Sequence, residues 1–267
     1  MKIAICYYGL VGSSNFKYGK GSSLDPEIAY NSHKKFLFDN KYNIDIFIHS
    51  QSFDQKEILI DLYNPKEYFI EKQKNFFFQT LFHKEVINNF LSIPFKIFKR
   101  NENFKSLSEK LRKTFLRCKN SRSRWYSTKK VVDLKRKYEI KMGFNYDLVM
   151  LTRLDVGFFS KFDFDTLPKE KLTVSNHNDV PAPRNNYKQE VLKNNRTEER
   201  GISDFWFISS SKKIDNFASL YDNFNRYSIS PHVSSYQHTK KNNIELNFYK
   251  YRSIDHEVIR RINKSSE

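Results

Sequence analysis

The sequence is poor in cysteine, glycine and proline. Its two cysteines, Cys6 and Cys118, lie far apart and lack the spacing of metal ligands, which excludes a disulfide framework and a cysteine-rich zinc site. Such sparse cysteine is typical of a reducing compartment, so we expect a cytoplasmic protein. With 7 Gly and 7 Pro in 267 residues, collagen-like and linker-rich architectures are excluded as well.

Long apolar runs and several common motifs are also missing. The apolar start at 3–12 is too short for a signal peptide, and no segment approaches the roughly 18 apolar residues of a membrane span. The seven histidines show no zinc-binding spacing, and no G-x-S-x-G elbow appears. Residues 14–23 lack the first glycine of a P-loop and read as a flexible basic loop. We therefore expect any membrane contact to be peripheral.

Aromatic and basic residues are abundant instead. The chain has 25 Phe, 16 Tyr and a formal net charge of +17, from 47 Lys and Arg against 30 Asp and Glu. Such an excess attracts phosphates, nucleic acid or an anionic membrane surface. The joint abundance of Lys, Asn, Ile, Phe and Tyr is also what an AT-rich genome produces. Charge therefore leaves open a non-catalytic basic protein that binds nucleic acid or an anionic membrane.

Strands and helices alternate along the predicted chain. Asp25 and Pro26 are an N-cap and a first-turn residue for a helix at 26–40, between buried strands at 2–10 and 43–50. This βαβ unit predicts parallel strands joined by a right-handed crossover. The other predicted elements are a strand at 66–71, helices within 72–120, an amphipathic helix at 123–142 ending near Gly143, a strand at 146–151, a loop at 175–201, a strand at 203–210, and helices at 212–227 and 254–263.

A charged pair directly follows the buried run LVML. Ligands of α/β folds bind beyond the carboxyl ends of the strands, where Arg153 and Asp155 are predicted to lie. Residues two apart in a strand point to the same side, while Leu154 turns back into the core. Asp155 can then hold Mn²⁺ or Mg²⁺ against a diphosphate, and Arg153 can neutralise phosphate oxygens. A structural ion pair that merely ends the strand is the alternative.

Five segments together resemble a family of bacterial GT-A-like glycosyltransferases of capsule, lipooligosaccharide or O-antigen assembly. In chain order they are MKIAICYYGL, DIFIHS, SRWYSTKKVVDLKRKYE, YDLVMLTRLDV and SDFWFISSSKKIDNFASLYDNF. The resemblance implies an α/β fold over 1–267, with a mostly parallel sheet flanked by helices and a helical insertion at about 72–120. Residues 1–155 would bind the nucleotide-sugar, and 156–267 the acceptor. The likeness is weakest in 72–120 and 175–201.

The resemblance also implies a nucleotide-sugar donor and a glycan or lipid-linked glycan acceptor, with no nucleic acid partner. Arg153 and Asp155 occupy the place of the family's metal motif, but Arg153 replaces the first carboxylate of Asp-x-Asp. Relatives often carry an Arg in the first loop, so Lys17 or Lys20 would have to serve here. The cationic surface is expected to allow peripheral contact with an anionic membrane.

The predicted donor crevice combines strand ends with the start of a helix. Its expected members are Tyr8, Gly9, Ser50, Arg124 and Arg153, with the ring of Tyr8 stacking on the base. An inverting transfer also needs a base to deprotonate the acceptor hydroxyl. Asp204, at the beginning of the strand predicted at 203–210, is the candidate, and the alternative is that Asp204 only caps the strand and faces solvent.

Overall fold

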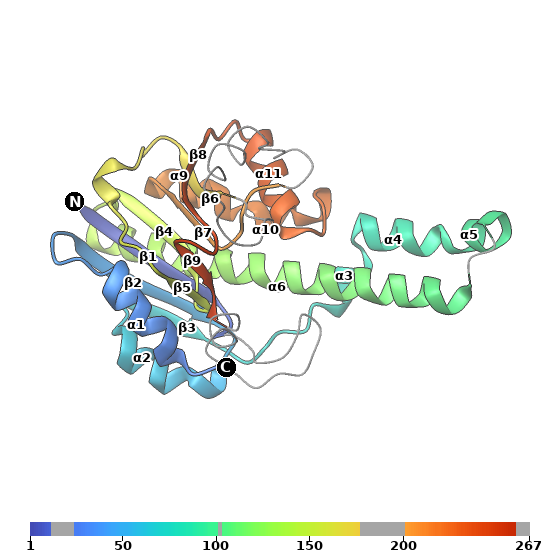
Figure 1. Cartoon of the computed structure of the whole chain (residues 1–267), viewed down its shortest axis with the longest axis horizontal. Helices are drawn as coiled ribbons and strands as arrows, with labels where there is room; N and C mark the ends of the chain where they lie inside the picture. The colour runs from blue at the N-terminus through green and yellow to red at the C-terminus, as the bar shows by residue number, and fades with distance from the viewer. Residues whose placement is uncertain (12–23, 101–102, 177–200, 260–267) are drawn as a thin grey trace.

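The structure, a computed structural model, describes residues 1–11, 24–100, 103–176 and 201–259. In these ranges a seven-stranded sheet has helices on both faces (Figure 1). The strands are β1 (Lys2–Gly9), β2 (Asn43–Ser50), β3 (Glu67–Ile70), β4 (Leu148–Arg153), β5 (Val156–Phe158), β6 (Leu172–Asn176), β7 (Trp206–Ser209), β8 (Leu246–Tyr251) and β9 (His256–Val258). The helices are α1 (Pro26–Phe36), α2 (Lys56–Tyr63), α3 (Phe77–Leu81), α4 (Lys84–Leu91), α5 (Ile93–Arg100), α6 (Phe104–Met142), α9 (Ser211–Ala218), α10 (Leu220–Asn223) and α11 (Pro231–Lys241).

The strand order in the large sheet is β3-β2-β1-β4-β7-β6-β8. Only β7 runs against its neighbours, because β4 and β6 both pair with it antiparallel and every other pairing is parallel. A second, two-stranded sheet joins β5 to β9. The predicted mostly parallel α/β sheet flanked by helices, with a helical insertion, is confirmed.

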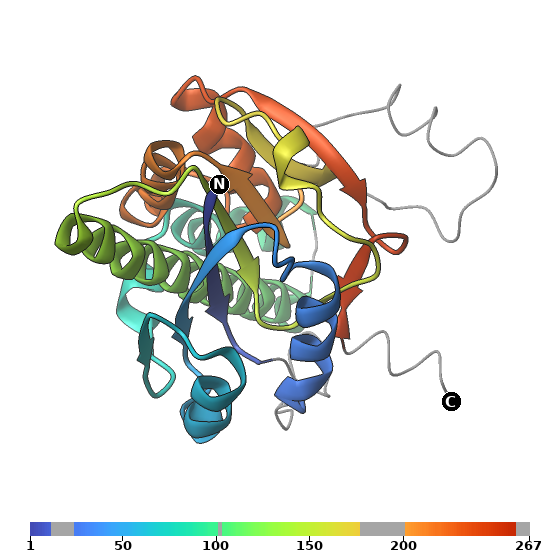
Figure 2. The ribbon, with the colours of Figure 1, turned by 90° about the vertical axis from the view of Figure 1, so that its left-hand side faces the viewer.

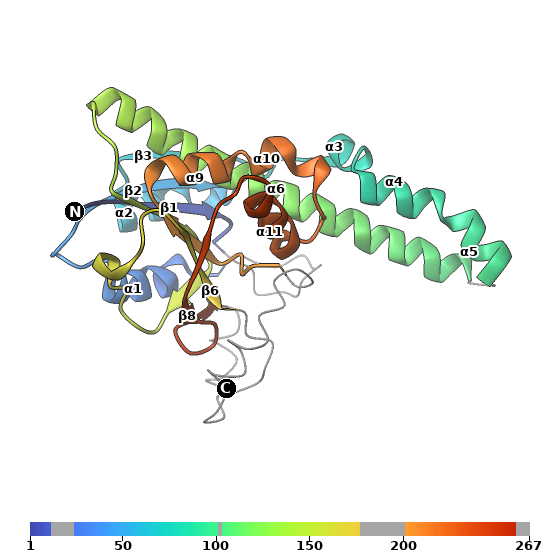
Figure 3. The ribbon, with the colours of Figure 1, turned by 90° about the horizontal axis from the view of Figure 1, so that it is seen from above.

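Alternate residues of the buried strands face two separate cores. In β1, Ile3 and Tyr7 belong to the core under α1 and α2, whereas Cys6 and Tyr8 belong to the core under α6 and α9. Figures 2 and 3 show the sheet between these two layers. Because both faces are covered, the central strands read as continuous apolar runs.

Most predicted elements occur with small changes of boundary. The Asp25 side chain accepts a hydrogen bond from the Glu27 amide at 2.9 Å, as expected of the N-cap of α1. The long helix α6 begins at Phe104, where Asn103 caps it, rather than at residue 123. It ends as predicted at Gly143, whose φ of 70° is left-handed.

Two predicted helices need correction. The final helix at 254–263 is wrong in its described part, because His256–Val258 is strand β9, paired with β5. The helix at 212–227 is divided into α9, α10 and a 3-10 turn (Phe224–Arg226). The loop at 14–23, with Lys17 and Lys20, and most of the loop at 175–201 lie outside the described residues. The division into donor and acceptor halves stays a prediction.

The helical insertion projects away from the sheet. Helices α3, α4 and α5 lie beside the first turns of α6, and together they form an arm that extends beyond the body (Figures 1 and 3). No helix in the described part of the chain is long and apolar enough to cross a membrane.

Candidate functional site

Four strands bring the predicted residues to one edge of the sheet. In the register of β1 with its neighbours, Tyr8 is opposite Arg153 of β4, and Gly9 is opposite Ser50 of β2. Since β7 runs antiparallel, it begins at the edge where β4 ends. The Arg153 amide accordingly donates to the carbonyl of Phe205, which directly precedes β7. The carboxyl edge of the sheet therefore gathers these residues into one region.

Arg153 and Asp155 form the predicted same-side pair. The Nε of Arg153 lies 2.7 Å from Oδ1 of Asp155, and a terminal guanidinium nitrogen lies 2.5 Å from Oδ2. Leu154 is 1% exposed and packs in the core, as expected. Burial opposes the charge on Arg153, but Asp155 outweighs this effect and raises the pKa of the guanidinium. The guanidinium of Arg153 thus stays charged at the carboxyl edge of the sheet.

A second charged pair joins α6 to the approach to β7. The guanidinium of Arg124 binds Oδ2 of Asp204, whose side chain is only 4% exposed. The hydroxyl of Tyr8 donates to the backbone carbonyl of Asp204 at 3.2 Å, which fixes this segment against β1. Two residues predicted independently, Arg124 and Asp204, are therefore in direct contact.

His232, on α11, is a neighbour of Asp204 that the sequence analysis did not identify. Its Nδ1 lies 3.3 Å from Oδ1 of Asp204 and 3.1 Å from the carbonyl oxygen of Ile202. A carbonyl oxygen only accepts hydrogen bonds, so Nδ1 carries the hydrogen and Nε2 is the acceptor nitrogen of the neutral ring. Burial, aided by the positive charge of Arg124, lowers the pKa of His232 to about 4. The imidazole is therefore neutral at physiological pH.

The backbone of His232 is held closely by Gly201. With φ of +79°, Gly201 is in a conformation that side chains rarely adopt, and a Cβ there would lie 2.0 Å from the His232 carbonyl oxygen. The Ile202 amide donates to that same carbonyl at 3.0 Å. Only glycine fits this approach between the segment before β7 and α11.

Arg252 is the second residue that the sequence analysis missed. Its guanidinium carbon lies 4.8 Å from the ring centroid of Phe205, and that of Arg153 lies 5.6 Å from the same ring. Glu257 binds Arg252, with Nε 3.1 Å from a carboxylate oxygen. No motif marks Arg252 in the sequence, because the pairing of β9 with β5 is what carries this segment back to the site.

The remaining donor-site predictions fare unequally. Tyr8 is fully buried and burial raises its pKa to about 12, so base stacking is wrong for this residue, since stacking needs an exposed ring face. Gly9 has φ of 97°, and its carbonyl accepts a hydrogen bond from the Ser50 hydroxyl at 2.8 Å. Ser50 and Gly9 thus shape the crevice edge together, and their contact with a donor stays a prediction.

The described residues do not form a ready-made metal site around Asp155. Both of its carboxylate oxygens are bound by Arg153, and no group of three or more metal-ligating side chains occurs within the four described ranges. Mg²⁺ bound with substrate phosphates needs one or two free carboxylates. Arg153 would have to release Asp155 first, so metal binding by Asp155 stays a prediction for a chelation experiment.

The arrangement can bind a polyanion and receive a proton. Arg124, Arg153 and Arg252 are each held by one carboxylate, and all three lower the pKa of His232, so a phosphate near His232 would bind through the remaining N–H groups of these guanidiniums. Asp204 holds a neutral imidazole by the nitrogen that carries its hydrogen. Cationic binding groups and a proton acceptor are thus adjacent.

Comparisons with known proteins give little beyond this. No protein-family model matches the sequence, and no curated protein matches it. Among solved structures, the chain is similar to the apo form of mouse xyloside xylosyltransferase 1, with 9% sequence identity and a TM-score of 0.39 over 93% of this chain and 84% of that one. A likeness this distant carries no information on the activity of this chain.

Proposed function

We propose that the protein is a glycosyltransferase that moves a sugar from a nucleotide-diphosphate donor to a growing bacterial surface glycan, such as capsule or lipooligosaccharide. The observation that carries the proposal is the group of three arginines around the Asp204–His232 pair at the carboxyl edge of the sheet. Ligands of open α/β sheets bind in this location.

The arginines suit a diphosphate leaving group. Guanidinium groups stay charged at all physiological pH values and bind phosphate oxygens through two parallel hydrogen bonds. Arg153 and Arg252 both lie near the ring of Phe205, and each is bound by a carboxylate, so their positions are fixed before a ligand arrives. Fixed cations of this kind stabilise the charge that develops as the diphosphate leaves.

The proposed transfer forms one bond and breaks another. The acceptor hydroxyl oxygen bonds to the anomeric carbon, and the carbon–oxygen bond to the diphosphate breaks with its electron pair leaving on the phosphate. The hydroxyl proton passes to Nε2 of His232. Asp204, which is buried and bound by Arg124, positions His232 in this assignment instead of taking the proton itself, the role first expected of it.

The first test measures nucleotide binding by thermal shift. UDP, GDP or CDP, or a sugar conjugate of one of them, is expected to raise the melting temperature, because a ligand of the native state stabilises it. Arg153→Gln should weaken binding roughly tenfold or more, since a charge-assisted hydrogen bond is lost. Arg136→Gln is the matched control, because Arg136 is half-exposed on α6 and pairs only with nearby Asp133 among the contacts described.

One result would contradict the proposal. If every nucleotide and nucleotide-sugar leaves the melting temperature unchanged while RNA raises it, the non-catalytic binding protein is favoured. Sugar transfer with the identified donor then decides the metal prediction. Full activity after EDTA would remove the metal and leave the arginines as the cationic partners, whereas activity restored only by Mn²⁺ or Mg²⁺ would return Asp155 to the role of ligand.

A further inference from the structure

The projecting arm exposes an unusual number of large apolar side chains. Of the nineteen large hydrophobic residues that are exposed in the described ranges, nine lie between residues 77 and 104. They are Phe77, Phe78, Leu81, Phe82, Ile87, Phe90, Leu91, Phe95 and Phe104. Exposed apolar groups concentrated in so short a segment mark an interaction surface.

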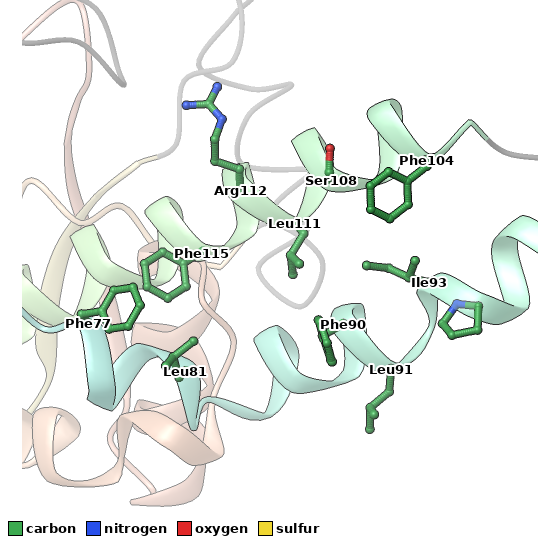
Figure 4. Close-up of a pocket in the computed structure, with 11 residues that line it drawn as sticks. Phe77, Leu81, Phe90, Leu91, Ile93, Phe104, Ser108, Leu111, Arg112 and Phe115 are labelled. Atoms are coloured by element: carbon green, nitrogen blue, oxygen red, sulfur yellow. The ribbon is translucent and has the colours of Figure 1, made fainter.

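A groove runs between α6 and the shorter helices α3, α4 and α5 of the arm. Its volume is about 630 Å³, and Figure 4 shows Phe90 of α4 and Leu111 of α6 pointing into the space between the helices. Arg112 points away from this space, so its charge lies outside the groove. The groove is apolar within and charged at its border.

The same segment is strongly basic. Residues 84–119 contain ten Lys and Arg against three Glu, which gives a formal charge of +7. Two copies of this arm would repel each other if their apolar faces met. The exposed Phe rings can stack on nucleic acid bases, but a nucleic acid offers no apolar partner for Leu81, Ile87 and Leu91. An anionic membrane has a negatively charged surface above an apolar layer. It therefore complements both the positive charge and the exposed apolar side chains of the arm.

We propose that the arm docks on an anionic lipid bilayer, with the exposed Phe and Leu side chains entering the boundary between headgroups and acyl chains and the Lys and Arg side chains binding the headgroups. The net charge of the chain by itself predicted peripheral contact without locating it. The arm supplies the location and the apolar component. This inference does not depend on the proposed sugar transfer.

The arm extends beyond the same edge of the sheet at which the candidate site lies. Arg124 of α6 contacts Asp204 at the carboxyl edge, and the residues of α6 after Arg124, from Trp125 to Val132, pack against the sheet. The turns before Arg124 therefore extend beyond that edge, as Figure 1 shows. A bilayer bound by the arm would face the candidate site.

The test is co-sedimentation of the full chain with lipid vesicles. We expect binding to phosphatidylglycerol-containing vesicles, weakened by salt, and little binding to phosphatidylcholine alone. The triple variant Phe90→Ser, Leu91→Ser, Phe104→Ser should bind roughly tenfold more weakly or worse, because the inserted apolar area is lost. These side chains are at least 61% exposed, so the fold should survive, which a circular dichroism melt checks.

The control is Ile140→Ser with Met142→Ser, which removes exposed apolar groups at the opposite end of α6 and should bind like the unaltered protein. Phe90→Trp should shift its fluorescence to shorter wavelength when anionic vesicles are added.

Equal sedimentation of the triple variant, or equal binding to neutral vesicles, would overturn the proposal. So would a dimer in light scattering that the triple variant abolishes, because the occupant would then be a second copy.

Discussion

His232 and Asp204 are in contact through the nitrogen of the imidazole that carries its hydrogen, and this contact separates their proposed roles. The imidazole side chain is about one-third exposed, at 32%, whereas the Asp204 carboxylate is 4% exposed and bound to Arg124. A carboxylate bound by a guanidinium is a weak proton acceptor, because the cation stabilises its charged form. The histidine side chain is the more accessible of the two.

Replacing each residue of the pair gives different expected results. His232→Gln should lower kcat about a hundredfold or more, the usual contribution of a general base, with the nucleotide affinity unchanged. Asp204→Asn should lower kcat less and leave a histidine-dependent pH profile. Initial rates at saturating donor measure both. If Asp204→Asn abolishes transfer while His232→Gln remains near normal, Asp204 is the base after all.

The acidic limit of activity provides a second measure of His232. The neutral ring accepts protons, so activity should be constant near neutral pH and fall as the pH decreases through the pKa of about 4. Removing the cation in Arg124→Gln should raise this pKa and move the limit to higher pH. Nuclear magnetic resonance titration of the ring gives the pKa independently of turnover.

At the scale of single elements, α6 carries a buried ion cluster that holds it to the sheet. Lys135 is fully buried, with Nζ 2.8 Å from Glu139 and 2.7 Å from Asp215 of α9. Glu139 also accepts a hydrogen bond from the Tyr146 amide at 2.8 Å, just before β4. The cluster thus joins α6, α9 and the start of β4.

Lys135→Met should therefore destabilise the protein by about 3–5 kcal/mol, because it leaves the buried carboxylate of Glu139 without its cation and removes the partner of the partly exposed Asp215. Lys129→Met is the matched control on the same helix. Its i,i+4 partner Asp133 is a quarter exposed, so this change should cost about 0.5 kcal/mol or less. Urea unfolding of the two variants compares the costs, and equal losses would show that Lys135 contributes only as a surface charge does.

The elements that the sequence predicts best are those buried on both faces. β1 and β4 are apolar runs because helices cover both sides of the sheet, and the ends of β1, β2 and β4 bring Tyr8, Ser50 and Arg153 to the carboxyl edge of the sheet, as predicted. Helices were predicted within 72–120, but the unbroken course of α6 from residue 104 to 142 was not, because its first half packs on α3, α4 and α5 and its second half on the sheet.

Other parts of the site depend on long-range pairing. β8 is only half-buried along its whole length, so its residues show no alternation that would indicate a strand. His232 lies on α11, and Arg252 lies between β8 and β9. Only the packing of α11 and the pairing of β9 with β5 bring these two residues to the candidate site. The hydrogen-bond partner of a histidine cannot be read from sequence spacing, since Ile202 and His232 are 30 residues apart.

For the whole molecule, buried histidines predict acid sensitivity. Burial lowers the pKa of His33 to about 4 and that of His256 to about 3, against an ordinary value of 6.5. Between about pH 6.5 and pH 4 these two histidines bind protons in the unfolded chain but not in the folded chain. The free energy of unfolding therefore falls as the pH decreases from about 6.5 to 4. The shift at His33 alone corresponds to about 3 kcal/mol.

Urea unfolding at a series of pH values measures this effect. His33→Gln removes one titrating group, so its free energy of unfolding should fall less steeply over the same interval, although the lost contacts of His33 with Tyr63 and Val156 lower stability at every pH. A free energy of unfolding that is constant or rises toward pH 4 would contradict the prediction.

The continuity of α6 has a consequence for which acceptors can react. One unbroken helix runs from Phe104 in the arm to Arg124 in the candidate site, and twenty residues at about 1.5 Å each span about 30 Å. With the arm on a bilayer, the reaction centre would stand no more than that height above the lipid. The protein would then favour acceptors whose reactive hydroxyl lies within about 30 Å of the membrane surface over the distant ends of longer glycan chains.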